Sequence, residues 1–301
     1  YAYLKIAEGC NNRCHYCAIP GIRGPLHSRD MADCVAEARW LAGEGVKELI
    51  VVAQDPTAYG EDWGRPGTIC ELLDRLQEID GIRWIRILYA YPERISDAFI
   101  AAMVRNTKVV PYLDLPIQHC DDAVLKAMNR RGGRKEIEDA IARLRAAIPG
   151  ITLRTTLIAG FPGETEEQYA ELCDFVKTVR FDRLGCFAYS AEENTVAARM
   201  ENQLDEETKQ RRADHIMELQ AEVSAAREGE KVGNTYECIC DGVDDETGMY
   251  LLRTKADCPE IDGNVLTPAD TPLETGAFYN VTITDADTYD LYGYAEEKLE
   301  D

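Results

Sequence analysis

The sequence of 301 residues predicts an α/β fold followed by a small all-β domain. Two patterns support this prediction. From Tyr3 to about Ser190, six short apolar runs alternate with amphipathic stretches, which is typical of parallel βα units. From Asn234 to Tyr294, short apolar runs are separated by turn residues, which indicates a small all-β barrel. Right-handed crossovers would curl the six units into a partial, TIM-like (βα)6 barrel or an open sheet.

The first part contains the strand and helix patterns in strict alternation. The predicted strands are Leu4–Ala7, Glu48–Ala53, Trp84–Leu88, Tyr112–Leu115, Thr152–Ala159 and Leu184–Tyr189. The predicted helices are Asp30–Ala42, Ile69–Ile79, Ser96–Val104, Asp122–Met128, Lys135–Ala147 and Glu166–Val179. In the first helix Val35, Ala38 and Leu41 recur on one face. The last helix follows Thr165, with Gln168 three residues later, which resembles a capping box.

A long helix is predicted to separate the two parts. Asp205–Arg227 has Asp205 as a plausible N-cap and an apolar stripe that includes Ile216, Leu219 and Val223. The strands predicted beyond it are Thr235–Cys240, Met249–Thr254, Ala277–Thr284 and Tyr289–Tyr294. We therefore expect a core domain over 1–204, a connecting helix over 205–230 and a β-barrel domain over 231–301.

The number and spacing of the cysteines indicate the cellular compartment of the protein. The 11 cysteines are odd in number and irregularly spaced in a chain too large to need disulfide staples. This favours a reducing compartment, so we expect a cytoplasmic protein. No apolar run approaches the length that spans a bilayer, and we expect no membrane association.

Cys10, Cys14 and Cys17 form a C-x-x-x-C-x-x-C triplet directly after the first predicted strand. Thiolates are the ligands that iron–sulfur clusters prefer, and a cluster of four irons held by three thiolates keeps one iron open for a ligand. A structural zinc site would instead need a fourth ligand from elsewhere in the chain. A zinc site with a remote ligand, or three ordinary cysteines, remains the alternative interpretation.

Other unusual residues follow the ends of later strands. Gln54-Asp55 follows the second strand, Gln118-His119 the fourth, and Gly160-Phe161-Pro162-Gly163-Glu164 the fifth. The carboxyl ends of parallel strands meet at one edge, which is where such folds place their chemistry. These residues are therefore expected near the cysteine loop.

The triplet, with Tyr16 before its last cysteine, resembles that of radical S-adenosylmethionine (SAM) enzymes, and further motifs resemble their methylthiotransferase family. The resemblance covers essentially the whole chain. The motifs are Glu8–Cys14, Ile19–Gly24, Ser28-Arg29, Ala53–Gly60, Asp114–His119, Met128–Arg130 and Arg154–Thr165. The segment Arg253–Gly263 resembles the TRAM domain with which these enzymes end.

The resemblance implies a 4Fe–4S cluster on Cys10, Cys14 and Cys17, and S-adenosylmethionine bound to its open iron. One electron from the cluster then breaks a carbon–sulfur bond of the cofactor, and the resulting 5′-deoxyadenosyl radical abstracts hydrogen from the substrate. The cofactor-binding candidates that it suggests are Tyr16, Gln54, Gln118, Arg154, Gly160 and Glu164. Arg154 could pair with the cofactor carboxylate, and the Gly160–Glu164 loop could cradle the adenine. The alternative is that these polar residues satisfy local hydrogen bonds and that the loop is a tight turn that needs glycine.

Charge helps to choose between the branches of the family. The segment 231–301 has 17 Asp and Glu against 4 Lys and Arg, and the whole chain has a net charge of −22. TRAM domains typically bind RNA, but an acidic surface repels phosphate and suits a basic protein instead. Gln54-Asp55 and Tyr289–Gly293 also look like the RimO-like branch, which acts on ribosomal protein. Acidity could also serve solubility alone.

The function implied is methylthiolation of an aspartate β-carbon in small ribosomal subunit protein twelve, with electrons from an external donor. The alternatives are a transfer-RNA methylthiotransferase of the same family and a non-enzymatic, zinc-stapled binding module. Family members also carry an N-terminal domain whose three cysteines hold a second 4Fe–4S cluster. The remaining cysteines of this chain form no second triplet. We therefore expect the chain to lack that domain, and to cleave S-adenosylmethionine without completing sulfur insertion.

Overall fold

The first part of the chain is built round one open sheet of parallel strands. The computed structural model describes residues 1–268 and 272–300. Each strand lies beside the one before it, in the order β1-β4-β5-β6-β7-β8, and all adjacent pairs are parallel. The strands are β1 (Ala2–Lys5), β4 (Glu48–Val52), β5 (Trp84–Ile87), β6 (Val109–Asp114), β7 (Thr152–Ala159) and β8 (Arg183–Ala188). This confirms the predicted α/β architecture.

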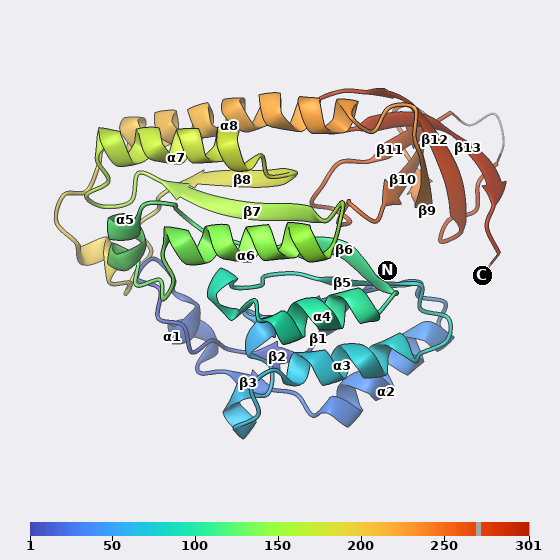
Figure 1. Ribbon diagram of the computed structural model, residues 1–301, viewed down its shortest axis with the longest axis horizontal. Helices are drawn as coiled ribbons and strands as arrows, with labels where there is room; N and C mark the ends of the chain where they lie inside the picture. The colour runs from blue at the N-terminus through green and yellow to red at the C-terminus, as the bar shows by residue number, and fades with distance from the viewer. Residues whose placement is uncertain (269–271, 301) are drawn as a thin grey trace.

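Helices cover the outer face of this curved sheet (Figure 1). They are α2 (Met31–Gly43), α3 (Thr68–Gln77), α4 (Asp97–Arg105), α5 (Asp122–Ala127), α6 (Arg134–Ala147), α7 (Glu166–Val179) and α8 (Glu206–Gly229). Several begin where a side chain accepts the first free backbone N–H groups, which otherwise have no partner within the helix. These N-cap residues are Asp30, Ser96, Asp121, Thr165 and Asp205.

The apolar core lies between the sheet and these helices. Strand residues such as Leu49, Ile87 and Leu153 are fully buried there, together with Leu72 and Leu172 from the helices. Burial of this apolar surface is the main force that holds the helices on the sheet. The opposite face of the sheet carries charged residues, among them Glu48, Arg86 and Asp114, which alternate along the strands with the core residues.

Three short elements follow or bracket the cysteine triplet and were not predicted. β2 (Ala7–Glu8) pairs antiparallel with β3 (His27–Ser28), and α1 (Ile19–Arg23) lies between them. Figure 1 places α1 and α5 at the left of the view, where β7 and β8 end. The triplet is therefore held at the carboxyl edge of the sheet, as expected.

The second part of the chain is a closed barrel. Its strands are β9 (Thr235–Val243), β10 (Tyr250–Thr254), β11 (Val265–Thr267), β12 (Phe278–Ala286) and β13 (Leu291–Lys298). Their order is β10-β11-β13-β12-β9, in which β11 and β13 run parallel and the other pairs antiparallel. The all-β barrel was predicted, but β11 was not.

The barrel packs against the sheet at the end where the strands begin (Figure 1). Ile239, Cys258 and Phe278 of the barrel domain share a buried cluster with Trp84 and Tyr112 of the sheet. The rings of Trp84 and Phe278 meet edge to face, with centroids 5.0 Å apart. Through this contact, apolar side chains of the barrel domain cover the end of the sheet at which the strands begin.

Buried ion pairs reinforce the same contact. The Glu48 carboxylate is fully buried and accepts Arg86 Nε at 2.7 Å and Arg253 Nη1 at 2.8 Å. Arg183, the first residue of β8, donates to Asp257 Oδ1 at 2.6 Å. Since charges this deeply buried must be paired to be tolerated, the two parts of the chain depend on each other here.

None of the helices in the described ranges is both long and apolar enough to span a membrane.

Candidate functional site

The cysteine loop is closed at its base by backbone contacts. Cys10 N donates to Gly24 O at 3.1 Å, just beyond the β2–β3 pair. Gly9 adopts φ +74°, and a Cβ at this position would lie 2.1 Å from Pro25 O. Glycine is therefore required for the two sides of the loop to approach so closely. The thiols are not needed to hold the loop together.

The turn that ends α5 clamps the middle of the loop. His15 N donates to Met128 O at 2.9 Å, and its ring Nδ1 lies 2.8 Å from Ala127 O. The side chain of Asn129 donates to Arg13 O at 2.6 Å. His15 thus holds the loop in place.

All three predicted cysteines line a single cavity. Its volume is about 340 Å³, and its walls include Gln54 and Tyr89. The Cys14 thiol is buried, with Sγ 3.6 Å from the hydroxyl of Tyr91. Burial raises the pKa of the Cys10 and Cys17 thiols. A bound metal centre would reverse this effect, because a cation nearby stabilises thiolates.

Asp55, at the end of β4, anchors the loop to the sheet. Its Oδ2 accepts Asn12 Nδ2 and Arg94 Nε, each at 3.0 Å, and its Oδ1 accepts the Thr57 hydroxyl. Burial raises the pKa of Asp55, and these donors oppose that effect. Both carboxylate oxygens are thus engaged within the protein, and Asp55 positions Asn12 rather than reaching the cavity.

The two predicted glutamines differ in their surroundings. Gln54 lines the cysteine cavity, and its buried Oε1 has no hydrogen-bond partner. Gln118 instead extends the edge of β6 along β7, where its N donates to Thr156 O and its O accepts Ile158 N. Gln118 has φ +70°, an uncommon conformation outside glycine. It is not among the residues that line the cysteine cavity.

The structure does not bring Arg154 to the cysteine cavity. Its Nη1 donates to Asp114 Oδ1 at 3.0 Å, and its Nε lies 3.7 Å from Asp262 Oδ1 of the barrel domain. It lines a separate cavity of about 480 Å³ between the sheet and the barrel. Arg154 already has two carboxylates beside it, one from each part of the chain. It therefore helps to hold the barrel domain against the sheet.

The predicted loop after β7 is closed by Glu164. Glu164 Oε2 accepts Gly160 N at 3.0 Å, and Oε1 accepts Arg212 Nη1 at 2.7 Å. Burial alone would raise the pKa of Glu164, but its partners His119, Gly160 and Arg212 lower it below the ordinary value. The carboxylate is therefore occupied in shaping the loop, which matches the alternative given for this motif.

Gly160→Ala should destabilise the fold more than Gly163→Ala. Both glycines have positive φ, which costs other residues about 1–2 kcal/mol. At Gly160 a Cβ would also lie 2.6 Å from Lys209 Cγ on α8, whereas at Gly163 it meets nothing within 4 Å. Urea unfolding of the two variants measures the difference, and equal stabilities would show that α8 moves aside at no cost.

Tyr16 lies behind the loop, with its hydroxyl hydrogen-bonded to the thiol of Cys14 and to Arg130. Its ring packs against a buried cluster that includes Met128, Phe161 and Tyr189. Burial raises the pKa of its hydroxyl well above the ordinary value. Its aromatic ring thus joins the cysteine loop to the loop after β7.

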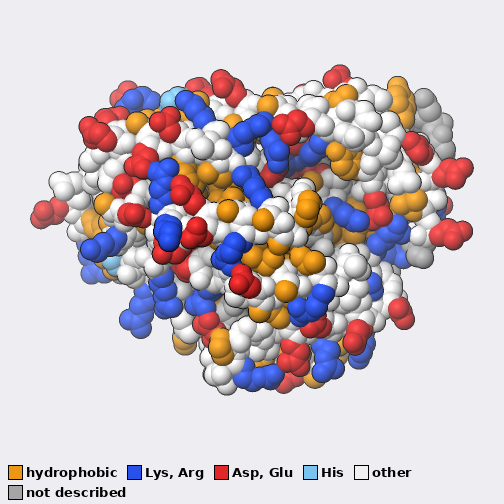
Figure 2. All heavy atoms as spheres, viewed as in Figure 1, with side chains coloured by type: hydrophobic (Ala, Val, Ile, Leu, Met, Phe, Trp, Pro, Cys, Tyr) orange, Lys and Arg blue, Asp and Glu red, His pale blue; other side chains and the backbone are white. Residues whose placement is uncertain are grey.

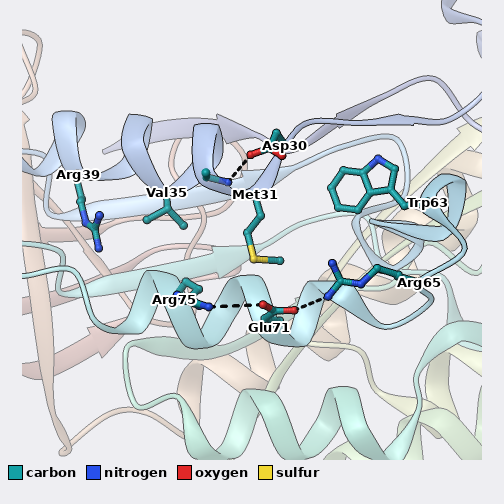
Figure 3. A pocket seen from close by; sticks show the side chains of 9 residues that line it. Asp30, Met31, Val35, Arg39, Trp63, Arg65, Glu71 and Arg75 are labelled. Carbon is teal, nitrogen blue, oxygen red and sulfur yellow. Dashed lines mark hydrogen bonds and ion pairs between the residues drawn. The ribbon is translucent and has the colours of Figure 1, made fainter.

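A further cavity lies away from the cysteine loop. It has a volume of about 710 Å³ and lies between α2 and α3. Figure 3 shows Arg65 and Arg75 reaching the same carboxylate, Glu71, at 2.9 and 3.7 Å. None of the predicted site residues lines this cavity.

The three thiols do not surround a single point. Among the described residues no group of three or more His, Cys, Asp and Glu side chains is close enough to hold one metal ion. A mononuclear zinc site needs its ligands at about 2.0–2.3 Å from one centre. A cluster of four irons attaches each thiolate to a different iron, so it accepts a wider triangle.

Comparison with protein families decides the affiliation of the chain. Residues 4–176, more than half of the chain, match the model of the radical SAM superfamily. The chain belongs to the radical SAM superfamily. Residues 232–295 match the TRAM domain, and this range covers the closed barrel from β9 to most of β13.

Close relatives share most of this chain. It is 48% identical over 293 residues to ribosomal protein uS12 methylthiotransferase RimO of Acetivibrio thermocellus, and 49% identical over 294 residues to that of Pelotomaculum thermopropionicum. Each alignment covers 97% of this chain, but 65% and 66% of the respective relatives. The chain thus spans slightly less than two-thirds of the length of these relatives.

Solved structures with the same fold are more distant in sequence. Coproporphyrinogen III oxidase HemN of Escherichia coli has a TM-score of 0.56 at 15% identity, and the match covers 93% of this chain and 66% of that one. The radical SAM methyltransferase TsrM of Kitasatospora setae has a TM-score of 0.52 at 17% identity, covering 62% of this chain and 36% of that one. These likenesses support the fold of the core.

Membership of the superfamily implies a 4Fe–4S cluster and S-adenosylmethionine. The residues present fit these groups. Three free thiols line one cavity, which is the donor set that a cluster with an open iron needs. Gln54 lines the same cavity, and its buried Oε1 has no hydrogen-bond partner within the described protein, which is compatible with a bound group nearby.

Several residues of the site were missed in the sequence analysis. Asn12, Tyr91, Arg94 and Arg130 all lie at or beside the cysteine cavity. The position of Tyr91-Pro92-Glu93-Arg94, just after the third predicted strand, was a usable signal. Site residues were predicted after the first, second, fourth and fifth strands but not after this one.

Proposed function

We propose that the chain performs the radical chemistry of a methylthiotransferase that modifies the β-carbon of an aspartate in ribosomal protein uS12. The observation that carries this proposal is the single cavity lined by Cys10, Cys14, Cys17 and Gln54. A relative named ribosomal protein uS12 methylthiotransferase is 48% identical to this chain, which supports ribosomal protein uS12 as the substrate.

In this proposal Cys10, Cys14 and Cys17 hold a 4Fe–4S cluster. When bound, the cluster supplies one electron that cleaves the sulfonium of S-adenosylmethionine to a carbon radical. Gln54 lines the cavity and contacts the cofactor there, and Asn12 is held in the cavity wall by Asp55. Tyr16, Gly160 and Glu164 support the loops around the cavity.

The substrate is proposed to be basic because the barrel is acidic. The segment 231–301 has a net charge of −13. Figure 2 shows Asp and Glu side chains projecting from the barrel end at the right of the view. Such a surface steers basic proteins and repels RNA, so RNA binding by the TRAM domain is not part of the proposal. The proposed function also includes an external electron donor and a cytoplasmic location.

The division at 204 and 230 is retained as a proposal. The segment 205–230 consists almost wholly of α8, which packs its buried side against β8 through residues such as Ile216 and Gln220. We therefore propose that α8 moves with the core domain, and that the barrel domain begins at 231.

The test is to reconstitute the chain anaerobically with iron and sulfide and then add dithionite and S-adenosylmethionine. We expect a brown protein that releases 5′-deoxyadenosine. A uS12 peptide that carries deuterium on the β-carbon of its target aspartate should transfer that deuterium to the 5′-deoxyadenosine, whereas transfer RNA should not react. A colourless protein with stoichiometric zinc, or reaction with transfer RNA alone, would refute the proposal.

A further inference from the structure

The turn after α5 places a positive charge behind the cysteine loop. Arg130 belongs to the Met128–Arg130 motif, which the roles assigned above do not use. Its side chain is only 3% exposed. Arg130 N donates to Leu125 O at 2.9 Å, which returns the chain towards α5, and Asn129 beside it holds the loop at Arg13 O.

Among the described residues, Arg130 faces one carboxylate, that of Glu93, at a distance longer than a hydrogen bond. Its Nη2 donates to Pro116 O at 3.1 Å, a neutral acceptor. Glu93 Oε2 lies 3.8 Å away, which is beyond hydrogen-bonding distance. The guanidinium also stacks 4.2 Å above the ring of Tyr91 and hydrogen-bonds the Tyr16 hydroxyl. Burial without a tightly paired carboxylate is costly for a guanidinium, so a compensating negative charge is expected close by.

Tyr91 connects this charge to a thiol of the triplet. Its hydroxyl lies 3.6 Å from Cys14 Sγ, close enough for an O–H···S hydrogen bond. Tyr91, Arg130 and Cys14 all line a second cavity of about 350 Å³, and Tyr91 and Cys14 also line the cysteine cavity. Cys14 therefore lies between the cysteine cavity, where the cofactor is proposed to bind, and the side chains of Arg130 and Tyr91.

We propose that Arg130 and Tyr91 are positioning residues that raise the reduction potential of the cluster through Cys14. This inference rests on the cluster of the proposed function. Reduction adds one electron, taken from the external donor, and so adds one negative charge to the cluster and its thiolates. A buried cation and a hydrogen bond to a thiolate both stabilise the reduced state more than the oxidised state. Neither residue needs to touch S-adenosylmethionine.

The experiment is a spectroelectrochemical titration of the reconstituted chain without S-adenosylmethionine. At a fixed potential, Arg130→Met should lower the ratio of reduced to oxidised cluster about tenfold, which is 59 mV for a one-electron couple. Tyr91→Phe should lower it less, and Arg130→Lys should retain most of the wild-type potential because it keeps the charge. Tyr112→Phe is the control, since it also removes a buried hydroxyl, here bonded to Asp262 at 2.7 Å.

The outcomes separate this inference from the function beneath it. A wild-type chain that takes up no cluster would overturn both. Variants that load the cluster fully but keep the wild-type potential would overturn the inference alone, as would equal shifts in Arg130→Met and Arg130→Lys. If Arg130→Met fails to fold, Tyr91→Phe decides, since it deletes only one oxygen: a negative shift supports the inference and no shift overturns it.

Discussion

Replacing Cys14 with alanine should abolish both cluster uptake and 5′-deoxyadenosine formation. Of the three thiols Cys14 is the most buried, and it shares one cavity with Cys10 and Cys17. Loss of an outer partner of a metal ligand typically costs about 10–100-fold in affinity, and loss of a ligand itself should cost more. Iron analysis, the visible spectrum and chromatography of the nucleoside product measure the two losses.

The matched control for this experiment is Cys70→Ala. Cys70 is also partly buried, but it lies on α3 and outside the cysteine cavity. This variant should bind iron and form product like the wild type, and Cys10→Ala and Cys17→Ala should behave like Cys14→Ala. Wild-type iron content in Cys14→Ala would show that its thiol is not a ligand.

Glu48→Gln should lower the free energy of unfolding by about 3–5 kcal/mol, as expected when one partner of a buried ion pair is removed. The fully buried Glu48 carboxylate lies between Arg86 of the sheet and Arg253 of the barrel. A neutral amide would leave both guanidinium groups without this counter-charge. Unfolding in urea, followed by circular dichroism, measures the loss.

Glu71→Gln provides a close comparison. Glu71 also lies between two arginines, Arg65 and Arg75, but its side chain is 43% exposed. Exposed ion pairs contribute about 0–1 kcal/mol because water screens them, so this variant should be nearly as stable as the wild type. Equal losses in the two variants would show that burial of Glu48 adds nothing to the joint.

The elements that the sequence predicted best have strong local signals. β7 and α7 have the predicted bounds, Thr152–Ala159 and Glu166–Val179. The Thr165 capping box fixes the start of α7, and its Thr165 and Gln168 hydrogen bonds form as expected. The cysteine triplet was equally local, because three ligands within eight residues must share one loop.

The parts that sequence reasoning missed depend on partners far along the chain. Arg154 is the third residue of the eight in β7, and its neighbour Asp262 comes from the barrel domain. No pattern near Arg154 predicts that contact. Likewise, Glu164 follows a glycine-rich turn, but its role became clear only from Arg212 on α8. β11 has three residues, too few for a periodic pattern.

Tyr91 and Arg130 show the same limit within the site. They are distant in sequence, and only the fold stacks one on the other beside Cys14. Tyr91 comes soon after a predicted strand, so its position in the sequence was a usable signal. Arg130 belongs to a motif of the family, but a short polar segment between two helices does not predict that its side chain is buried.

The joint between sheet and barrel has a consequence for geometry. Glu48 and Arg183 tie the barrel to the sheet through buried charges, which a pivoting motion would have to pull apart. The barrel is therefore held at a fixed position relative to the sheet. For a protein that binds the barrel, the fold sets the distance between the bound surface and the cysteine loop. For the proposed function, this separation would select the target residue by its distance from the bound surface as well as by its chemistry.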